Sequence, residues 1–508
     1  MTSLYLFQIG PVQSFIAAAR RTQDLYVGSR LLTLLAKAGI TQAQQLGVDD
    51  DSMIFPAMKD GNLPTSIPHR FAFLSEREDM GALIETAIRD YWIDHVVNEV
   101  GQWVWDQIGD GEWMERYRNQ TQSWLECFWV RVAYDPRNHG ESYSRASVAM
   151  ASRRQLRDFP QMVDVGEKKC TLTGMGAALS NDERFWDRLR DSEPLRHQWG
   201  EDDHMVIRTN ERLGAVALIK RVGQWAVPAL REEADQIMRF SDLDTIAREG
   251  KPEPKGEKQP LYLAILHMDG DHMGRRLSAC KEKAQHQQLS LDLALFAEYK
   301  APEIVKEHSG TLIYAGGDDV LALLPLRKAL PCANELRNAL SAAIGQGASA
   351  SAGIALMKAS LPLDGAMDDA RQAEKIAKNE FGRNAVAIRD SRSTAIRETG
   401  AKWDEVAELV TNLQSAFEKQ QGWLSSSIGY DVRAASPALW GTKVPAEARA
   451  FELRRLLKRR TDPKIEGKQE KINELAEPLI QLGEKHGWDR LGDWMILARF
   501  LASGGGHS

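Results

Sequence analysis

The sequence predicts an α+β fold with two ferredoxin-like domains, a helical intermediate domain and a helical C-terminal domain. Three observations predict this fold. Between residues 261 and 389, apolar runs of strand length alternate with helical periodicity in the order β-α-β-β-α-β. A less distinct copy of that order occupies residues 4–133. Beyond residue 400 the apolar positions follow mostly helical spacing.

The distinct copy begins with a buried strand and contains a hairpin. Its expected elements are a strand at Leu261–Met268, a helix at about 291–308, strands at Thr311–Ala315 and Val320–Pro325, a helix at Arg327–Ile344, an extended run at Ser349–Leu356, a helix at Gly365–Glu380 and a strand at Ala385–Arg389. Four alanines, Ala366, Ala370, Ala373 and Ala377, form one stripe of the last helix.

The less distinct copy precedes it. Its expected elements are a strand at Leu4–Ile9, a helix at Val12–Ala38, extended pieces near 52–56 and 70–74, a helix at 80–125 and a strand at Phe128–Ala133. It has no paired carboxylates at the matching positions, so we predict a non-catalytic duplicate. Chance similarity is the alternative interpretation.

Composition bounds the partners and the compartment. A chain of 508 residues is long enough for three or four domains, and 65 basic against 71 acidic residues give a net charge of -6. Nucleic-acid contact therefore requires local basic patches. Four cysteines without a C-x-x-C pair indicate no disulfide framework. Because no signal peptide or membrane helix is recognisable, a cytoplasmic protein without membrane contact is predicted.

One charged, proline-rich segment, Pro252–Pro260, is typical of a linker. We predict domains at 1–160, 161–258, 259–395 and 396–508, with a disordered tail at Gly504–Ser508.

The connection between the two hairpin strands reads Gly316-Gly317-Asp318-Asp319. Two glycines provide the positive φ of a tight turn. Two successive carboxylates repel one another unless a cation compensates, and their hard oxygen atoms suit Mg²⁺ or Mn²⁺. The turn therefore predicts a metal site, although a surface turn without function is the structural alternative.

Asp269 ends the preceding core strand, and Asp271 follows it. In a β-α-β-β unit the first strand lies beside the hairpin, so Asp269 should converge with Asp318 and Asp319. We predict these three as catalytic metal ligands and Asp271 as a further ligand. Two metal ions about 3.5–4 Å apart would activate a ribose hydroxyl and stabilise the leaving pyrophosphate.

Further residues are expected to bind the nucleotide. Lys375 and Lys378 share one helical face and are followed by Arg383 and Asn384, which suits a triphosphate. A solvated helix face is the alternative. The glycines expected to shape the nucleotide site are Gly270, Gly274, Gly316 and Gly317.

Together these motifs resemble the palm domains of GGDEF cyclases and, more closely, the large polymerase-like subunit of type III-B (Cmr-type) CRISPR effector complexes. The segments Ile9–Ile16 and Arg20–Ser29 resemble the opening signature of that family, and Ile67–Phe71 resembles its Pro-Asn-Arg-Phe element. The match continues through Met268–Gly274, the GGDD turn, Ser351–Ile354 and the helix around Ala377-Lys378. It spans most of residues 1–395.

The resemblance implies two palm (nucleotidyl-cyclase) domains that polymerise ATP into cyclic oligoadenylate when guide RNA in the complex pairs with target RNA. It implies metal binding by the three aspartates and phosphate contact by Lys378. Gln13, Ser14 and Arg20 are candidates for the acceptor side. The partners would be the other subunits of the complex and its RNAs.

Two departures from the family also carry expectations. The chain begins at the first palm and lacks a His-Asp dipeptide, so no DNase activity is predicted. Around Lys169-Cys170, Thr173 stands where a second cysteine is expected, so no zinc is predicted.

Three alternatives remain open at this stage. The palm is silent and the chain is a scaffold; the acceptor is an adenosyl compound other than ATP; or the protein is a free-standing diguanylate cyclase, which the second palm-like half disfavours. The basic run Arg454–Arg460 suits RNA, a protein neighbour or a solvated face.

Overall fold

The structure is a computed structural model of the full chain. It describes residues 1–508 except 60, 110, 157–167, 175, 197–205, 234–236, 238–240, 250–259, 392–395, 419–421, 440–443 and 505–508. Most of the predicted linker and nearly all of the predicted disordered tail lie outside the described residues.

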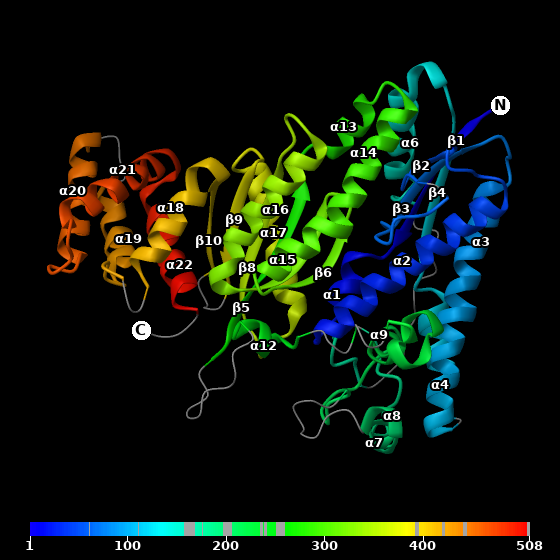
Figure 1. Ribbon diagram of the computed structural model, residues 1–508. Coiled ribbons are helices and arrows are strands. Elements are labelled where there is room, and N and C mark those ends of the chain that lie inside the picture. The colour runs from blue at the N-terminus through cyan, green and yellow to red at the C-terminus, as the bar shows by residue number, and fades with distance from the viewer. Residues whose placement is uncertain are drawn as a thin grey trace. The chain divides into compact units, whose positions relative to one another are not determined.

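The chain forms two compact units, and each is described by itself. The first contains residues 1–240, 272–298 and 362–364, and the second contains residues 241–271, 299–361 and 365–508. Figure 1 shows the helices and strands of both.

The first unit contains a four-stranded antiparallel sheet. Its strands are β1 (Ser3–Gly10), β2 (Met53–Phe55), β3 (Arg70–Ser75) and β4 (Glu126–Ala133), in the order β2-β3-β1-β4. This is the order of a ferredoxin-like sheet. Phe7 of β1 stacks on Phe71 of β3 with ring centroids 4.8 Å apart, and both side chains are fully buried. The predicted strands of the first half are therefore confirmed.

Two long helices predicted in the first half are interrupted. The helix predicted at Val12–Ala38 divides at Ala18–Arg21. The one predicted at 80–125 contains a π-helical turn, and its α-helical parts include one that ends at Ile108 and one that begins at Trp113. The helices of this unit are α1 (Gln13–Ala17), α2 (Thr22–Gln45), α3 (Met80–Trp92), the π-helix Ile93–Val97, α4 (Asn98–Ile108), α5 (Trp113–Gln122), the 3-10 turn Pro136–Asn138, α6 (His139–Arg153), α7 (Glu183–Asp191), α8 (Glu193–Arg196), α9 (Ala215–Ala226), α10 (Pro228–Arg231), α13 (Met273–Ala279) and α14 (Lys283–Leu295).

Helices α13 and α14 come from the middle of the sequence but pack within the first unit. Helix α14 lies against β2, where the Ala57 amide donates to Ser290 Oγ at 2.8 Å. Helix α13 lies against α6, where a Cβ on Gly140 would be 2.1 Å from the Ser278 carbonyl oxygen. The sequence indicated a helix at 291–308 but gave no sign of this partner.

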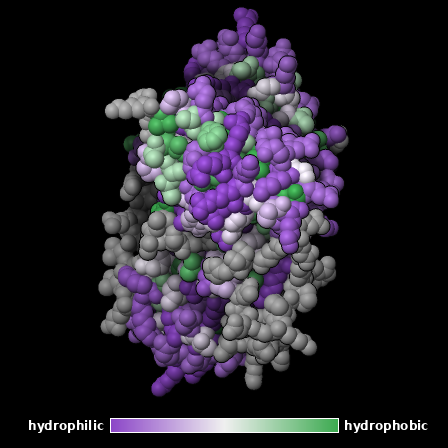
Figure 2. Space-filling model, turned by 90° about the vertical axis from the view of Figure 1, so that its left-hand side faces the viewer, coloured by the Kyte–Doolittle hydropathy of each residue, from purple (hydrophilic) through white to green (hydrophobic). Residues whose placement is uncertain are grey.

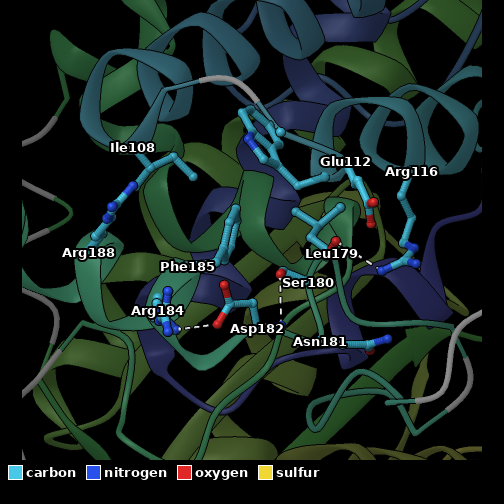
Figure 3. Close-up of a pocket in the computed structure, with 12 residues that line it drawn as sticks. Ile108, Glu112, Arg116, Leu179, Ser180, Asn181, Asp182, Arg184, Phe185 and Arg188 are labelled. Atoms are coloured by element: carbon cyan, nitrogen blue, oxygen red, sulfur yellow. Dashed lines mark hydrogen bonds between the residues drawn. The ribbon is translucent and has the colours of Figure 1, made fainter.

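A cavity of about 430 Å³ opens in the first unit. Arg116 and Arg188 lie on opposite sides of it, and Phe185 lies between them (Figure 3). Arg116 donates to the carbonyl oxygens of Ala178 and Leu179, which fixes its guanidinium. None of the sequence-predicted site residues lines this cavity.

The second unit contains a six-stranded sheet in the order β10-β9-β8-β5-β7-β6. Its strands are β5 (Tyr262–Gly270), β6 (Thr311–Gly316), β7 (Asp319–Pro325), β8 (Ala350–Lys358), β9 (Ala385–Asp390) and β10 (Arg397–Lys402). The order β8-β5-β7-β6 is again ferredoxin-like and confirms the predicted fold class. Strand β9 pairs in parallel with β8, and β10 adds an antiparallel edge. The sheet thus continues to Lys402, into the range 396–508 that was predicted as a helical C-terminal domain.

Helices cover the sheet of the second unit and follow it at the C-terminal end. They are α12 (Leu243–Ala247), α15 (Ala301–Glu307), the 3-10 turn Leu326–Lys328, α16 (Ala329–Ile344), α17 (Leu363–Asn379), α18 (Trp403–Ala416), α19 (Ile428–Leu439), α20 (Ala446–Arg460), α21 (Lys468–His486) and α22 (Trp488–Ser503). A π-helical turn, Phe296–Lys300, precedes α15.

Close packing brings α17 onto the middle of the sheet. A Cβ on Gly353 of β8 would lie 2.0 Å from the Ala370 carbonyl oxygen of α17. The predicted alanines Ala370, Ala373 and Ala377 are fully buried. Small residues on both elements therefore set the height of α17 above β5 and β8, which positions the polar residues at its C-terminal end.

The C-terminal helices present a mainly hydrophilic face (Figure 2). In the predicted basic run on α20, Arg454 contacts Glu477 at 2.7 Å, and Arg455 contacts Glu452 at 2.7 Å. Arg460 contacts Asp431. Much of this charge is therefore paired within the helical domain, which favours a structural role over phosphate contact.

Candidate metal and nucleotide site

The GGDD turn is the tip of the β6–β7 hairpin. Gly316 pairs with Asp319 across the hairpin, so Gly317 and Asp318 form the connection. Gly317 has a φ of +72°, which L side chains rarely adopt. The turn predicted from the two glycines is therefore present. Asp318 and Asp319 are half-buried.

Strand pairing brings Asp269 to the same edge of the sheet. Met268 of β5 pairs with Val320 of β7, so the next residue of β5 comes level with Asp319. A Cβ on Gly270 would lie 2.8 Å from Asp318 Oδ2. The end of β5 and the hairpin tip therefore lie in contact, as the β-α-β-β order predicts.

Two residues of α17 complete this carboxylate-rich edge. Lys378 Nζ contacts Asp269 Oδ2 and lies 2.6 Å from Glu374 Oε1. Glu374 was not predicted from the sequence, although its i,i+4 spacing to Lys378 is a recognisable signal. The Glu374 side chain is 9% exposed and the Lys378 side chain 17%.

Three carboxyl groups at this edge have raised pKa values. Burial raises the pKa of Asp318 to about 6. Burial, then the charges of Asp318 and Glu374, raise the pKa of Asp319 well above its ordinary value. Burial and the Asp271 charge raise the pKa of Glu374 to about 7. Because charged carboxylates are unfavourable here without compensation, the edge attracts a cation.

Lys378 and Tyr314 respond to the same environment. Burial and the charge of Arg383 lower the pKa of Lys378 to about 8. Burial and the charges of Asp319 and Asp318 raise the pKa of Tyr314. Tyr314 Oη is buried and has no hydrogen-bond partner among the described residues. This hydroxyl lies under the GGDD turn, and the sequence gave no reason to select it.

Asp271 is engaged by protein groups. Its carboxylate accepts hydrogen bonds from Ser349 Oγ at 2.7 Å, Ser351 Oγ at 2.8 Å and the Asn384 amide at 2.8 Å. These bonds tie β5 to β8 and to the loop after α17. The geometry therefore supports a structural role for Asp271, and its predicted metal role gains no support.

Carboxylate oxygens at the sheet edge fit Mg²⁺ or Mn²⁺ chemically. In the part of the chain that the structure describes, however, no three His, Cys, Asp or Glu side chains are arranged to hold a metal ion. The Lys378 ammonium lies on Asp269 instead. Metal binding here requires Lys378 to leave Asp269 and the carboxylates to turn toward one another.

Two other predicted nucleotide residues, Lys375 and Gly274, lie on helices. Lys375 is exposed on α17, one turn from Lys378. Gly274 lies on α13 in the first unit, and a Cβ there would meet nothing within 4 Å. A side chain at position 274 would therefore meet no close neighbour, and the role of Gly274 in shaping the nucleotide site stays a prediction.

The candidate acceptor residues lie around α1 in the first unit. Gln13 and Ser14 are exposed. Arg20 lies 3.6 Å from Glu211 and donates to the Thr171 carbonyl oxygen at 3.5 Å. Arg20 is thus held by the region after residue 160.

Two buried cations, which the sequence analysis did not select, hold the turn between α1 and α2. Lys220 of α9 donates to the carbonyl oxygens of Phe15, at 2.6 Å, and Ala18. Arg221 bonds Asp24 at 2.8 Å and Glu211 at 2.6 Å. Two adjacent charges inside an apolar helical run were the signal available. These bonds explain why the predicted helix breaks there.

Cys170 does not assemble a recognisable zinc site in the described residues. It is a buried free cysteine whose carbonyl oxygen accepts from the Gly174 amide at 2.8 Å. The absence of zinc stays a prediction.

Family comparisons agree with this arrangement. The family described as "Cas10/Cmr2, second palm domain" matches residues 262–387, and "CRISPR-associated protein Cmr2, N-terminal" matches residues 4–98. The CRISPR system Cmr subunit Cmr2 of Pyrococcus furiosus is 34% identical over 160 residues, covering 25% of this chain and 18% of that protein. Over these two segments, the chain resembles Cas10/Cmr2 proteins. Its alignment with this relative thus spans under a fifth of the relative's length.

Solved structures share the fold of this chain. A type III-B Cmr-beta structure in the apo state has a TM-score of 0.67 and 12% identity, covering 92% of this chain and 78% of that one. The structure of Cmr-beta bound to cognate target RNA has a TM-score of 0.62 and 13% identity, covering 92% of this chain and 79% of that one. A Csm1-Csm4 cassette in complex with cA4 has a TM-score of 0.54 and 13% identity, covering 98% of this chain and 70% of that one. At such identities the similarity establishes the fold alone.

A membrane-spanning helix is not found among the described residues, since none of their helices combines sufficient length with sufficient apolar character.

Proposed function

We propose that this protein is the large subunit of a cytoplasmic type III-B CRISPR effector complex and joins ATP into cyclic oligoadenylate when target RNA pairs with the guide RNA. The observation that carries the proposal is the sheet edge where Asp318 and Asp319 at the hairpin tip lie next to the end of β5, whose Asp269 pairs with Lys378. The family match over residues 262–387 and the neighbour solved with cA4 support it.

Each group at the edge has a proposed task. Asp269, Asp318 and Asp319 hold two Mg²⁺ or Mn²⁺ ions, which when bound promote attack by a ribose hydroxyl and stabilise the departing pyrophosphate. Lys378 contacts the triphosphate, and Gly317 lets the chain turn so that both hairpin carboxylates reach the edge. Lys375, on the same helix, is a second phosphate contact.

The acceptor nucleotide is assigned to the first palm. Gln13 and Ser14 offer exposed polar groups on α1, and Arg20 is fixed nearby by Glu211 and Thr171. An adenosyl compound other than ATP remains an alternative acceptor. The proposed partners are the other subunits of the complex, the guide RNA and the target RNA.

A catalytically silent scaffold is the second candidate. It is favoured by the ion pair between Lys378 and Asp269 and by the lack of a three-ligand cluster in the described residues. Under this hypothesis the lysine permanently neutralises the edge.

The test is incubation of the purified complex, with guide and matched target RNA, with Mn²⁺ or Mg²⁺ and radiolabelled ATP. We expect target-dependent oligoadenylate from the wild type and a loss of at least about 100-fold in the Asp318→Ala, Asp319→Ala double variant. An unmatched RNA is the control for activation, and RNA binding by both proteins is the control for assembly. If no nucleotide gives a product while RNA binding is intact, the scaffold hypothesis is supported and the proposed catalysis is contradicted.

A further inference from the structure

The ammonium of Lys378 pairs with the carboxylate of Asp269, which is a proposed metal ligand. It contacts Asp269 Oδ2 and lies 2.6 Å from Glu374 Oε1. The side chains of Asp269 and Glu374 are 28% and 9% exposed, so water screens this charge only partly. Lys378 is therefore a counter-ion for both Asp269 and Glu374.

A metal ion and the ammonium compete for the same carboxylate. A divalent cation at Asp269 would repel an ammonium already in contact with that oxygen, so the two exclude one another. Lysine carries its charge on a flexible four-carbon stem, which allows the head to move while the helix stays in place. Its neighbour Glu374 is one turn away on the same helix and remains an anchor for the lysine.

The loop after α17 contains a second basic side chain, Arg383, that could contact an anion. Arg383 lies close enough to Lys378 to lower its pKa, and Arg383 Nε is buried without a hydrogen-bond partner among the described residues. Arg383 and Asn384 both have positive φ values, 64° and 47°, which cost energy in residues other than glycine. Asp271 holds this loop through the Asn384 amide, and Arg337 donates to Asn384 Oδ1 at 2.7 Å.

We propose that Lys378 blocks the metal position on Asp269 until a nucleotide arrives, when the triphosphate draws the lysine toward Arg383 and frees Asp269 for the metal ion. This inference rests on the proposed function and adds a rule for loading the site. The nucleotide and the metal then bind cooperatively, and each strengthens the other by the same factor. A metal ion alone binds weakly because it must displace the ammonium.

The test measures Mn²⁺ affinity of the full chain without nucleotide, by electron paramagnetic resonance of free Mn²⁺. We expect Lys378→Met to bind Mn²⁺ at least about 5-fold more tightly than the wild type. Lys306→Met is the matched control, because it removes one exposed lysine charge from α15 of the same unit, at a residue without an assigned role in the site. Its affinity should change by less than about 2-fold, since exposed charges are screened.

A non-hydrolysable ATP analogue supplies the second arm. It should tighten Mn²⁺ binding by the wild type at least about 5-fold and by Lys378→Met much less. If Lys378→Met binds Mn²⁺ no more tightly than the wild type without nucleotide, the proposal that Lys378 blocks the metal position is wrong. Lys378→Gln, with circular dichroism of both variants, replaces the methionine variant if that one does not fold.

The Asp318→Ala, Asp319→Ala variant separates the two proposals. If it loses Mn²⁺ binding while Lys378→Met shows no gain, the metal site stands and only the exchange fails. If it binds Mn²⁺ as the wild type does, the metal is elsewhere and the proposed function itself fails.

Discussion

At the scale of single residues, Gly270 decides how closely the end of β5 approaches the hairpin tip. A Cβ at this position would lie 2.8 Å from both Cβ and Oδ2 of Asp318, so one of the two elements must move. Asp318 is a predicted metal ligand, and its displacement changes the spacing of the carboxylates. The glycine is thus required by contact and not by its backbone angle.

We predict that Gly270→Ala lowers oligoadenylate synthesis at least about 10-fold and destabilises the second unit by about 1–3 kcal/mol, as overpacking does. Product formation by the complex and denaturant unfolding of the chain measure these effects. Gly365→Ala on α17 is the control, because a Cβ there meets nothing within 4 Å. Wild-type activity in Gly270→Ala would show that Asp318 need not keep this position.

The sequence predicted the residues whose role depends on local order and missed those that depend on distant partners. Asp269, Asp318 and Asp319 were predicted to lie together because strand order alone brings them to one edge, and their role as metal ligands stays a prediction. Asp271 was selected with them, but its partners Ser349 and Asn384 lie 78 and 113 residues away. No local pattern reveals such partners.

At the scale of elements, two buried histidines connect α6 and α14. His139 Nε2 and His286 Nδ1 are 3.0 Å apart, and both side chains are fully buried. Tyr134 Oη lies 3.2 Å from His139 Nδ1, and the Tyr143 ring packs against His286. Burial and the charges of His139 and Arg70 lower the pKa of His286 to about 3, and burial and Lys283 lower the pKa of His139.

This contact predicts acid sensitivity of the first unit. The unfolded chain protonates His286 near pH 6.5, whereas the folded chain does so only near its pKa of about 3, so stability decreases as pH falls from 6.5 toward 3. At pH 5, the titration of His286 alone should lower the free energy of unfolding by about 2 kcal/mol relative to pH 7. Denaturant unfolding at pH 7 and pH 5 measures the difference.

The double variant His139→Phe, His286→Phe removes both titrating groups without leaving one unpaired. Its loss of stability between pH 7 and pH 5 should be smaller than that of the wild type by about 2 kcal/mol or more. Equal losses in the two proteins would assign the acid sensitivity to other groups.

Elements also differed from prediction where tertiary contacts override local pattern. The predicted helix at Val12–Ala38 is broken because Lys220 and Arg221 bond the turn between α1 and α2. Strand β10 was not predicted, because its short polar sequence acquires strand geometry only by pairing with β9.

At the scale of the whole molecule, apolar periodicity was sufficient to predict both ferredoxin-like sheets. The strands of each sheet follow the β-α-β-β-α-β order that the sequence shows. The assignment of α13 and α14 to the first unit did not follow from periodicity, because it depends on surfaces of β2 and α6 far away in sequence. The four predicted domain ranges stay predictions beside these two compact units.

The proposed reaction needs nucleotide contacts in both units, since Asp318 belongs to the second and Gln13 and Ser14 to the first. We therefore predict that ATP analogue with Mn²⁺ slows amide hydrogen exchange in 316–319 and the C-terminal part of α17, and also in 13–20. A ligand that binds only the folded state stabilises it by about 2.7 kcal/mol at 100 times its Kd, enough for measurable protection. Mass spectrometry of the complex resolves these segments.

Protection confined to the second unit would keep the donor site and remove the acceptor assignment of Gln13, Ser14 and Arg20. Loss of protection in both segments in the Asp318→Ala, Asp319→Ala variant would show that acceptor binding depends on the metal-bound donor.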